Sequence, residues 1–247
     1  MPPVFYGKKS EWLIRKEDQF RWLQSIAISG GILTIIVSLS VLPSSTFLSA
    51  FLVGGVVGTI LALLLKLYEF VALRAGLFAR GRKGEGAIFY ALNKLPDNWI
   101  VFQDVQINGK GNIDYIVLCP RGIFTIEVKS HEGEITYDGR ELRRNGYPLE
   151  KNFLQQARGE AWAVSDLLEK KLGEKFHFIR AVIVFSSWYA RLRLPPGVIN
   201  KVFVVKKKNL QKLMWWFPHT LSKDAVRDIE NILKNYTANP EPRIYHW

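Results

Sequence analysis

The chain has 247 residues, with 34 Lys and Arg against 22 Asp and Glu, which gives a formal net charge of +12. This length is enough for one ordinary domain with an appendage and for a sizeable hydrophobic core. Its 48% hydrophobic residues exclude a disordered chain, and its 23% charged residues exclude a protein buried wholly in lipid. Cys119 is the only cysteine, so an intramolecular disulfide and a cysteine-based zinc cluster are excluded. The four histidines form no HxxxH or HExxH pair, which excludes a zincin-type metal site.

Two apolar runs without a charged residue lie near the start of the chain, at Ser25–Leu42 and Phe47–Leu65. Each is about long enough to cross a hydrocarbon core of roughly 30 Å as an α-helix. Only Pro43–Thr46 lies between them, which is too short for a folded domain. We therefore expect a transmembrane helical hairpin whose two flanks lie on the same side. The alternative, a buried helical pair in a soluble protein, is disfavoured because both runs are uncharged and adjacent.

Basic residues flank this predicted hairpin, whereas its connecting loop has no Lys or Arg. They are Lys8, Lys9, Arg15, Lys16 and Arg21 before it, and Lys66, Arg74, Arg80, Arg82 and Lys83 after it. Positive flanks remain in the cytoplasm, so we expect a multi-pass protein of the cell membrane with both termini cytoplasmic. Gly54, Gly55 and Gly58 place small residues on one helix face, which suits close helix packing or a homo-oligomer formed through the hairpin.

From Gly81 onward, helical and strand-like patterns of apolar residues occur together, which indicates a mixed α/β domain. Helical spacing of apolar residues predicts helices at Gly84–Leu95, Asn152–Leu172, Asn209–Phe217 and Ser222–Tyr236. Apolar runs between turn residues predict strands at Trp99–Ile107, Ile113–Leu118, Ile123–Val128, Glu134–Tyr137, Glu141–Arg144, Arg180–Phe185 and Lys201–Val205.

These patterns predict five parts along the chain. They are a basic cytoplasmic segment (1–24), the transmembrane hairpin (25–65), a juxtamembrane linker helix (66–80), the α/β domain (81–236) and a flexible tail (237–247).

Two of the predicted strands form a hairpin that carries charged residues. Cys119–Gly122 is a four-residue turn with Pro at its second position and Gly at its fourth, which favours a tight reversal. If residues 119 and 122 pair, paired residue numbers sum to 241, and Asp114 then faces Glu127. Directly opposed side chains have Cβ atoms roughly 4.5–5.5 Å apart. Because side chains alternate along a strand, Lys129 lies on the same sheet face as Glu127.

Two carboxylates this close repel each other unless a cation lies between them. Mg²⁺ or Mn²⁺, which bind oxygen ligands, remove that conflict, and such an ion can activate water and stabilise charge on a phosphoryl group. The alternative is a structural Asp–Lys–Glu cluster on a solvated face, because a D…ExK pattern is common. The apolar flanks favour a functional site, since charges within a buried strand are costly.

An ordered set of short motifs resembles a known family. The motifs are Gly84-Glu85, Asn112-Ile113-Asp114, Gly122-Ile123-Phe124, Glu127-Val128-Lys129, Gly133 and Gln156-Ala157. Together they resemble the nuclease-related domain (NERD) of the PD-(D/E)xK nuclease superfamily, over roughly residues 81–172. The resemblance implies an α/β fold with a restriction-endonuclease-like mixed sheet flanked by helices.

The resemblance also implies a role for each of five residues. Asp114 and Glu127 would be metal ligands for Mg²⁺ or Mn²⁺, and Lys129 would be the lysine of the catalytic signature. Glu85 would supply a carboxylate from the first helix of the domain. Gln156 would be the glutamine on the helix after the hairpins. The implied activity is metal-dependent hydrolysis of phosphodiester bonds in DNA or RNA.

The residues leave some of these assignments open. From the sequence alone, Glu85 is also explained as an acid near a helix N-terminus, and Gln155 competes with Gln156. The sequence departs from the family pattern twice, with Tyr115 where a histidine is usual and Asn152-Phe153 where Asn-Pro is usual. We expect Tyr115 to point to the sheet face opposite Asp114, so the departure bears more on substrate positioning and on activity itself than on metal binding.

The expected partners are nucleic acid and the lipid bilayer, because a basic domain at a membrane is attracted electrostatically to both nucleic acid and anionic lipid. Candidate phosphate-binding residues are Lys206, Lys207, Lys208, Arg140, Arg143, Arg144, Arg191 and Arg193, although each run is equally explained as a solvated face. Trp188, Tyr189, Trp215 and Trp216 suit base stacking, but core packing or contact with the membrane surface explains them better. His131, two residues past Lys129, is placed to assist catalysis, although a histidine in such a turn is more often merely exposed, and we expect Cys119 to be inert.

Two rival functions remain. A catalytically silent nuclease fold can serve as a membrane-tethered nucleic-acid-binding or scaffold module. Alternatively, the hairpin assembles with partner helices and the domain is accessory, although the charge-free spans contain no sign of an ion or substrate path.

Overall fold

The computed structural model of the chain describes residues 2–7, 11–41, 47–107, 112–173 and 179–245. Within the helices, the side chains of residues 11–14, 17, 37–41, 47–53 and 77–78 are also outside the described part. The chain forms two compact units. One unit contains Glu11–Arg82, and the other contains Met1–Ser10 together with Lys83–Trp247.

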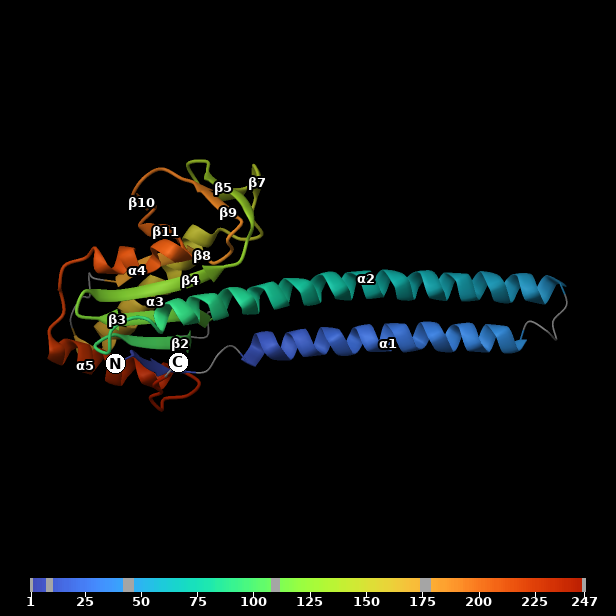
Figure 1. Cartoon of the computed structure of the whole chain (residues 1–247), viewed down its shortest axis with the longest axis horizontal. Coiled ribbons are helices and arrows are strands. Elements are labelled where there is room, and N and C mark those ends of the chain that lie inside the picture. The colour runs from blue at the N-terminus through green and yellow to red at the C-terminus, as the bar shows by residue number, and fades with distance from the viewer. Residues whose placement is uncertain (1, 8–10, 42–46, 108–111, 174–178, 246–247) are drawn as a thin grey trace. The chain divides into compact units, whose positions relative to one another are not determined.

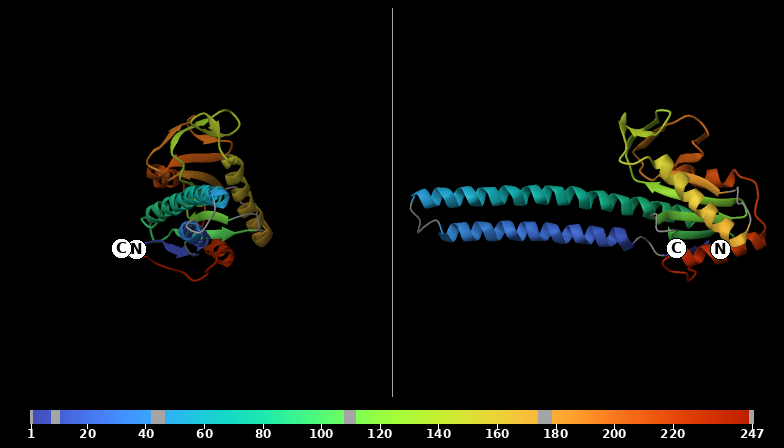
Figure 2. Two further views of the ribbon diagram at one scale, coloured as in Figure 1. Left: turned by 90° about the vertical axis from the view of Figure 1, so that its right-hand side faces the viewer. Right: turned by 180° about the vertical axis from the view of Figure 1, so that it is seen from behind.

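The first unit consists of helix α1 (Glu11–Val41) and most of helix α2 (Phe47–Leu92) (Figures 1 and 2). The two helices run antiparallel, and their contact is close at two glycines of α1. A Cβ placed at Gly30 would lie 3.6 Å from Leu64, and one at Gly31 would lie 4.0 Å from Leu61. By contrast, a Cβ at Gly54, Gly55 or Gly58 would meet no atom within 4 Å, so these glycines do not mediate packing between the described parts of the helices.

Most large apolar side chains that the structure describes in this unit are exposed, including Ile32, Leu33, Leu63 and Leu65. By length and composition, Gly54–Leu92 is the one helix among the described residues that can cross a membrane. The predicted turn Pro43–Thr46, and parts of both predicted spans, lie outside the described residues.

Helix α2 corrects the prediction of a separate helix beginning at Gly84. It continues without interruption from residue 47 to residue 92, through the predicted linker helix. No proline interrupts Phe47–Leu92, and isolated glycines cost only about 1 kcal/mol each within a helix. Glu85 therefore lies within a long helix, and the explanation as an acid at a helix N-terminus is wrong.

A seven-stranded mixed sheet forms the centre of the second unit. In sheet order its strands are β1 (Val4–Tyr6), β2 (Ile100–Gln106), β3 (Asn112–Cys119), β4 (Gly122–Lys129), β8 (Ile179–Phe185), β11 (Val202–Lys206) and β10 (Val198–Ile199). Strands β4, β8 and β11 are parallel, whereas β3 is antiparallel to β2 and β4. The predicted register of the hairpin is confirmed, because Cys119 pairs with Gly122 and Tyr115 pairs with Ile126.

Helices cover both faces of this sheet (Figure 1). Helix α3 (Phe153–Leu172) packs on β4 and β8, and α5 (Lys223–Leu233) lies beside it on β2 and β3. The last turns of α2 and helix α4 (Lys207–Trp215) bury the other face, which contains Tyr115, Phe124 and Ile126. Alternate residues of β4 therefore face opposite helical layers.

A second, four-stranded sheet has the order β7-β6-β5-β9. Its strands are β5 (Gly133–Tyr137), β6 (Leu142–Arg144), β7 (Tyr147–Pro148) and β9 (Ala190–Arg193). The sequence predicted β5 and β6 but not β7 or β9, and it missed β1 and β10 of the large sheet.

Both ends of the chain differ from their predicted descriptions. Strand β1 lies within the predicted basic segment and pairs with β2. The segment predicted as a flexible tail contacts the start of the chain: Arg243 and Phe5 exchange backbone hydrogen bonds, and Tyr245 packs edge-on against Phe5 and Phe89. This aromatic packing buries apolar surface of both segments.

Candidate functional site

Asp114 lies on β3 just beyond the last residue pair of the hairpin ladder, Tyr115 and Ile126. Its Oδ2 accepts a hydrogen bond of 2.7 Å from the backbone N–H of Val128, so the side chain continues the pairing where the ladder ends. Burial raises the pKa of Asp114 well above its usual range, and the negative charges of Glu127 and Glu85 raise it further. The three carboxylates therefore share one electrostatic environment.

Glu127 is 5% exposed and stands at the centre of a hydrogen-bond network. Its Oε1 accepts from Lys129 Nζ at 2.5 Å and from Gln156 Nε2 at 2.7 Å. Its Oε2 is buried and has no hydrogen-bond partner among the described residues. A buried carboxylate oxygen without a partner is costly unless a ligand completes the site.

Lys129 lies on the same side of β4 as Glu127, as the strand alternation predicted. Its side chain is 13% exposed, and its Nζ also donates to Gln156 Oε1 at 3.3 Å. The same ammonium lies 4.0 Å from the ring centroid of Phe153. An ion pair, an amide and an aromatic face thus fix the position of the charge.

Helix α3 brings Gln156 to the two charged residues of β4. The Asn152 side chain caps the helix by accepting a hydrogen bond from the backbone N–H of Gln155. Phe153 and Ala157, in the first turns of the helix, are buried. Gln155 is exposed, whereas Gln156 makes the contacts with Glu127 and Lys129. Of the two glutamines, Gln156 is therefore the one that contacts the charged residues of β4.

Sequence reasoning missed Glu160, which lies one helical turn after Gln156. Its Oε1 accepts from Gln156 Nε2 at 2.9 Å. Burial raises the pKa of Glu160 to about 9, and the charges of Glu127 and Asp114 contribute. The spacing of four residues from Gln156 was the available signal, because residues i and i+4 share a helix face.

Tyr115 points to the sheet face opposite the Glu127 network, as expected, and is buried with Phe124 and Ile126. Its hydroxyl donates to the backbone oxygen of Glu85 at 3.1 Å. The residue in the position where the family usually has a histidine thus contacts the helix segment that carries Glu85.

The remaining sequence candidates lie outside this network. His131 contacts Glu150 at 3.2 Å and lies beside Phe153, and burial lowers its pKa. Cys119 is a buried free thiol, and burial raises its pKa to about 11. Among the basic candidates, Arg143 pairs with Asp138 and Arg193 pairs with Glu134.

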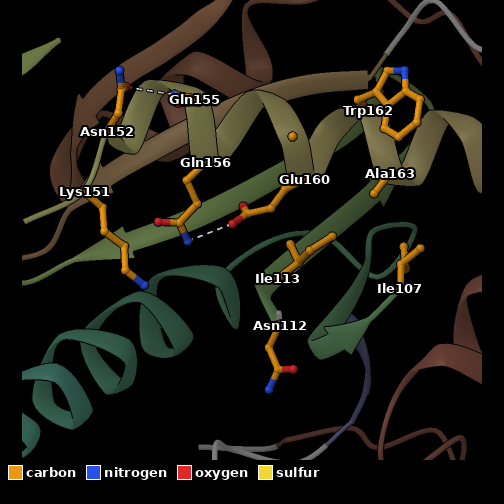
Figure 3. A pocket seen from close by; sticks show the side chains of 11 residues that line it. Ile107, Asn112, Ile113, Lys151, Asn152, Gln155, Gln156, Glu160, Trp162 and Ala163 are labelled. Atoms are coloured by element: carbon orange, nitrogen blue, oxygen red, sulfur yellow. Dashed lines mark hydrogen bonds between the residues drawn. The ribbon is translucent and has the colours of Figure 1, made fainter. Parts of the chain in front are cut away.

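An open cleft of about 680 Å³ adjoins the network along α3. Gln156 and Glu160 project from α3 into it, opposite Ile113 and Asn112 at the start of β3 (Figure 3). Because Gln156 also contacts Glu127, this amide connects the charged residues of β4 to the cleft.

The donor set suits a divalent ion. Mg²⁺ usually keeps several waters in proteins and needs only one or two carboxylates. Asp114 and Glu127 provide two neighbouring carboxyl groups, and Glu127 Oε2 has no other partner among the described residues. Within the same residues, no group of three or more His, Cys, Asp or Glu side chains forms a ready metal cage. An ion at this position would therefore keep water or substrate oxygens as further ligands.

Residues 80–186 match the family model of the nuclease-related domain. Neither the curated proteins nor the solved structures include a match to the chain. The matched segment contains the last turns of α2, the hairpin, α3 and β8, and thus every residue of the network. The mixed sheet flanked by helices is consistent with a nuclease fold.

Proposed function

We propose that the protein is a membrane-anchored, metal-dependent nuclease that hydrolyses phosphodiester bonds of DNA or RNA on the cytoplasmic side. The observation that carries this proposal is the convergence of Asp114, Glu127, Lys129 and Gln156 within a nuclease-related domain. Two carboxylates can hold a divalent ion, and a lysine beside them can stabilise negative charge on a phosphoryl group.

Asp114 and Glu127 would hold Mg²⁺ or Mn²⁺. When bound, such an ion supplies Lewis-acid stabilisation of the phosphoryl oxygens and lowers the pKa of a bound water. Lys129 would orient the attacking water and balance negative charge near the reacting phosphate. Gln156 is a positioning residue, because it holds Glu127 and Lys129 together through its two polar atoms.

Glu85 would act at longer range. Its charge already affects Asp114, so it helps to determine the protonation state of that ligand. Glu160, with a pKa of about 9, stays neutral at physiological pH and adds no further repulsion. The site therefore combines charges that a divalent cation would balance.

The proposed membrane anchor is the hairpin of α1 and α2. Gly54–Leu92 is long and apolar enough to cross a bilayer, and exposed apolar side chains on both helices suit a lipid environment. Because β1 precedes the helices and pairs with β2 after them, a membrane-spanning unit must cross an even number of times. This supports the expectation that both flanks of the hairpin lie on the same side of the membrane, and the basic residues of those flanks favour the cytoplasmic side.

A silent nuclease fold that binds nucleic acid or acts as a scaffold is the second candidate. The 2.5 Å ion pair between Lys129 and Glu127 favours it, because that pair already neutralises one acid without an ion. Cleavage activity separates the two functions.

The test is incubation of the detergent-purified chain with labelled DNA and RNA, with and without Mg²⁺ or Mn²⁺. We expect metal-dependent cleavage that Asp114→Ala and Lys129→Ala abolish while the fold is retained. Gln156→Ala should lower activity by roughly 10- to 100-fold, as loss of a group that orients a ligand does. Glu169→Gln, at an exposed position of the same helix that lines neither the network nor the cleft, is the control and should be neutral. Equal cleavage by the wild type and the Asp114 and Lys129 variants would refute the proposal.

A further inference from the structure

The cleft beside the carboxylate site has an exposed tryptophan at its edge. Trp162 of α3 is 63% exposed, although a large aromatic side chain gains most when it is buried. It projects from the side of α3 away from Gln156 and Glu160, at the end of the cleft far from Lys151 (Figure 3). Its indole ring is therefore available to a ligand that occupies the cleft.

The other walls of the cleft combine apolar and amide groups. Ile107, Ile113 and Ala163 provide apolar surface, and Asn112, Asn152 and Gln155 provide amides. Apolar surface with a few polar groups of both donor and acceptor type is the composition of a small-molecule site. A nucleobase fits this chemistry, because it presents flat faces for stacking and hydrogen-bonding edges for amides.

A second hollow of about 380 Å³ lies on the other side of Trp162. Arg158 and Lys201 line it, and neither has an ion-pair partner among the residues that the structure describes. Two unpaired cations beside a stacking ring suit the phosphate of a neighbouring nucleotide. Trp162 therefore lines both the cleft next to the site and a cationic hollow beside the same stretch of α3.

We propose that this cleft binds an unpaired nucleobase stacked on Trp162, so that the substrate is single-stranded nucleic acid. The inference rests on the proposed function, since it places the base next to the phosphate that the Asp114 and Glu127 site would cleave. Bases within a duplex stack on their neighbours and cannot enter a side pocket without being unpaired. Single strands, frayed ends and loops are thus favoured over intact duplex.

The experiment measures binding separately from cleavage. Fluorescein-labelled single-stranded DNA and RNA oligonucleotides, and the matched duplexes, are titrated with the detergent-purified full chain in EDTA. Fluorescence anisotropy gives the Kd. We expect tighter binding of single strands than of duplexes. Loss of one base–aromatic stack predicts that Trp162→Ala weakens single-strand binding at least about fivefold. Trp162→Phe, which retains an aromatic face, should restore most of the affinity.

Trp188→Ala is the matched control, because Trp188 is 81% exposed and does not line either hollow. Equal Kd values for the Trp162→Ala and Trp188→Ala variants, or duplex binding as tight as single-strand binding, would overturn the inference. Binding that depends on Trp162 in a chain that cleaves nothing would support the base site and refute the proposed hydrolysis. Cleavage that is insensitive to Trp162→Ala and Trp162→Phe, with unchanged Kd values, would leave the nuclease and remove the base site.

Discussion

Burial keeps Glu160 protonated in the folded chain at pH values where the unfolded chain has lost this proton. Its pKa is about 9 in the fold, against an ordinary value of 4.5. The unfolded chain releases this proton above about pH 4.5, whereas the folded chain keeps it up to about pH 9. The stabilisation is thus fully present below the lower pKa and is lost as the pH rises toward the higher one.

We therefore expect Glu160→Gln to stabilise the protein relative to the wild type by an amount that grows with pH. Glutamine retains hydrogen-bonding capacity toward Gln156 but cannot ionise. Thermal unfolding in EDTA, from about pH 5 to about pH 8, measures the difference in Tm between the two proteins. Glu169→Gln, an exposed position on the same helix, serves as the control. A difference that stays constant or shrinks with rising pH would contradict the account.

The sequence identified most of the residue network, because a strand alternates regularly and a tight turn fixes the register. The proximity of Asp114, Glu127 and Lys129 follows from this register and alternation. Gln156 could not be separated from Gln155 in the same way, since adjacent helix positions differ by about 100° and only packing decides which one faces the sheet.

At the scale of elements, the close approach between α2 and the strands explains why residue 84 is a glycine. A Cβ at Gly84 would lie 2.6 Å from Ser186 Oγ and 3.2 Å from Ser130 Cβ. The absence of a side chain at Gly84 lets the helix segment with Glu85 pack against the residues that follow β4 and β8. Both serines follow the carboxyl ends of parallel strands, so the contact helps to position the site.

Gly84→Ala should lower the free energy of unfolding by about 1–3 kcal/mol, because overpacking outweighs the better helix propensity of alanine. Gly159→Ala is the matched variant, since a Cβ there meets no atom within 4 Å. It should raise stability by roughly 0.5–1 kcal/mol. Chemical denaturation of both variants measures the two changes. A stabilising Gly84→Ala would show that the helix end is not held at this distance.

Several elements could not be predicted because their partners are distant in sequence. Strand β1 has three residues, and its partner β2 follows in the sequence only after the whole helical unit. Strand β9 pairs with β5 in parallel and has four residues. Such strands lack the length that makes alternation visible, and their stability comes from tertiary pairing. The apolar spacing after Gly84 predicts a separate helix, whereas α2 continues through this glycine to Leu92.

At the scale of the whole molecule, the helical unit is an insertion between β1 and the rest of the sheet-containing unit. The chain leaves that unit after residue 10 and re-enters it at residue 83. Both ends of the helical unit must therefore lie on the same side of any membrane that it crosses. This topology agrees with the basic residues on both flanks.

Cysteine labelling in intact cells tests this topology, because Cys119 is buried and is the only native cysteine. Ser45→Cys, between the two apolar runs, should react with a membrane-impermeant maleimide from outside the cell. Asn235→Cys, exposed next to α5, should react only after permeabilisation. The unsubstituted chain supplies the background. Labelling of Asn235→Cys in intact cells, or failure of Ser45→Cys to label there, would contradict a cytoplasmic domain.

The central claim is that the acids of β3 and β4 together hold a divalent ion. Calorimetric titration of the purified chain with Mn²⁺ measures this directly, without depending on the choice of nucleic acid. We expect binding by the wild type and by Glu169→Gln, and loss of binding in Asp114→Asn and Glu127→Gln. Affinity should rise with pH, because burial raises the pKa of Asp114 and the ion must displace its proton. No binding by the wild type, or unchanged binding by both variants, would contradict the account.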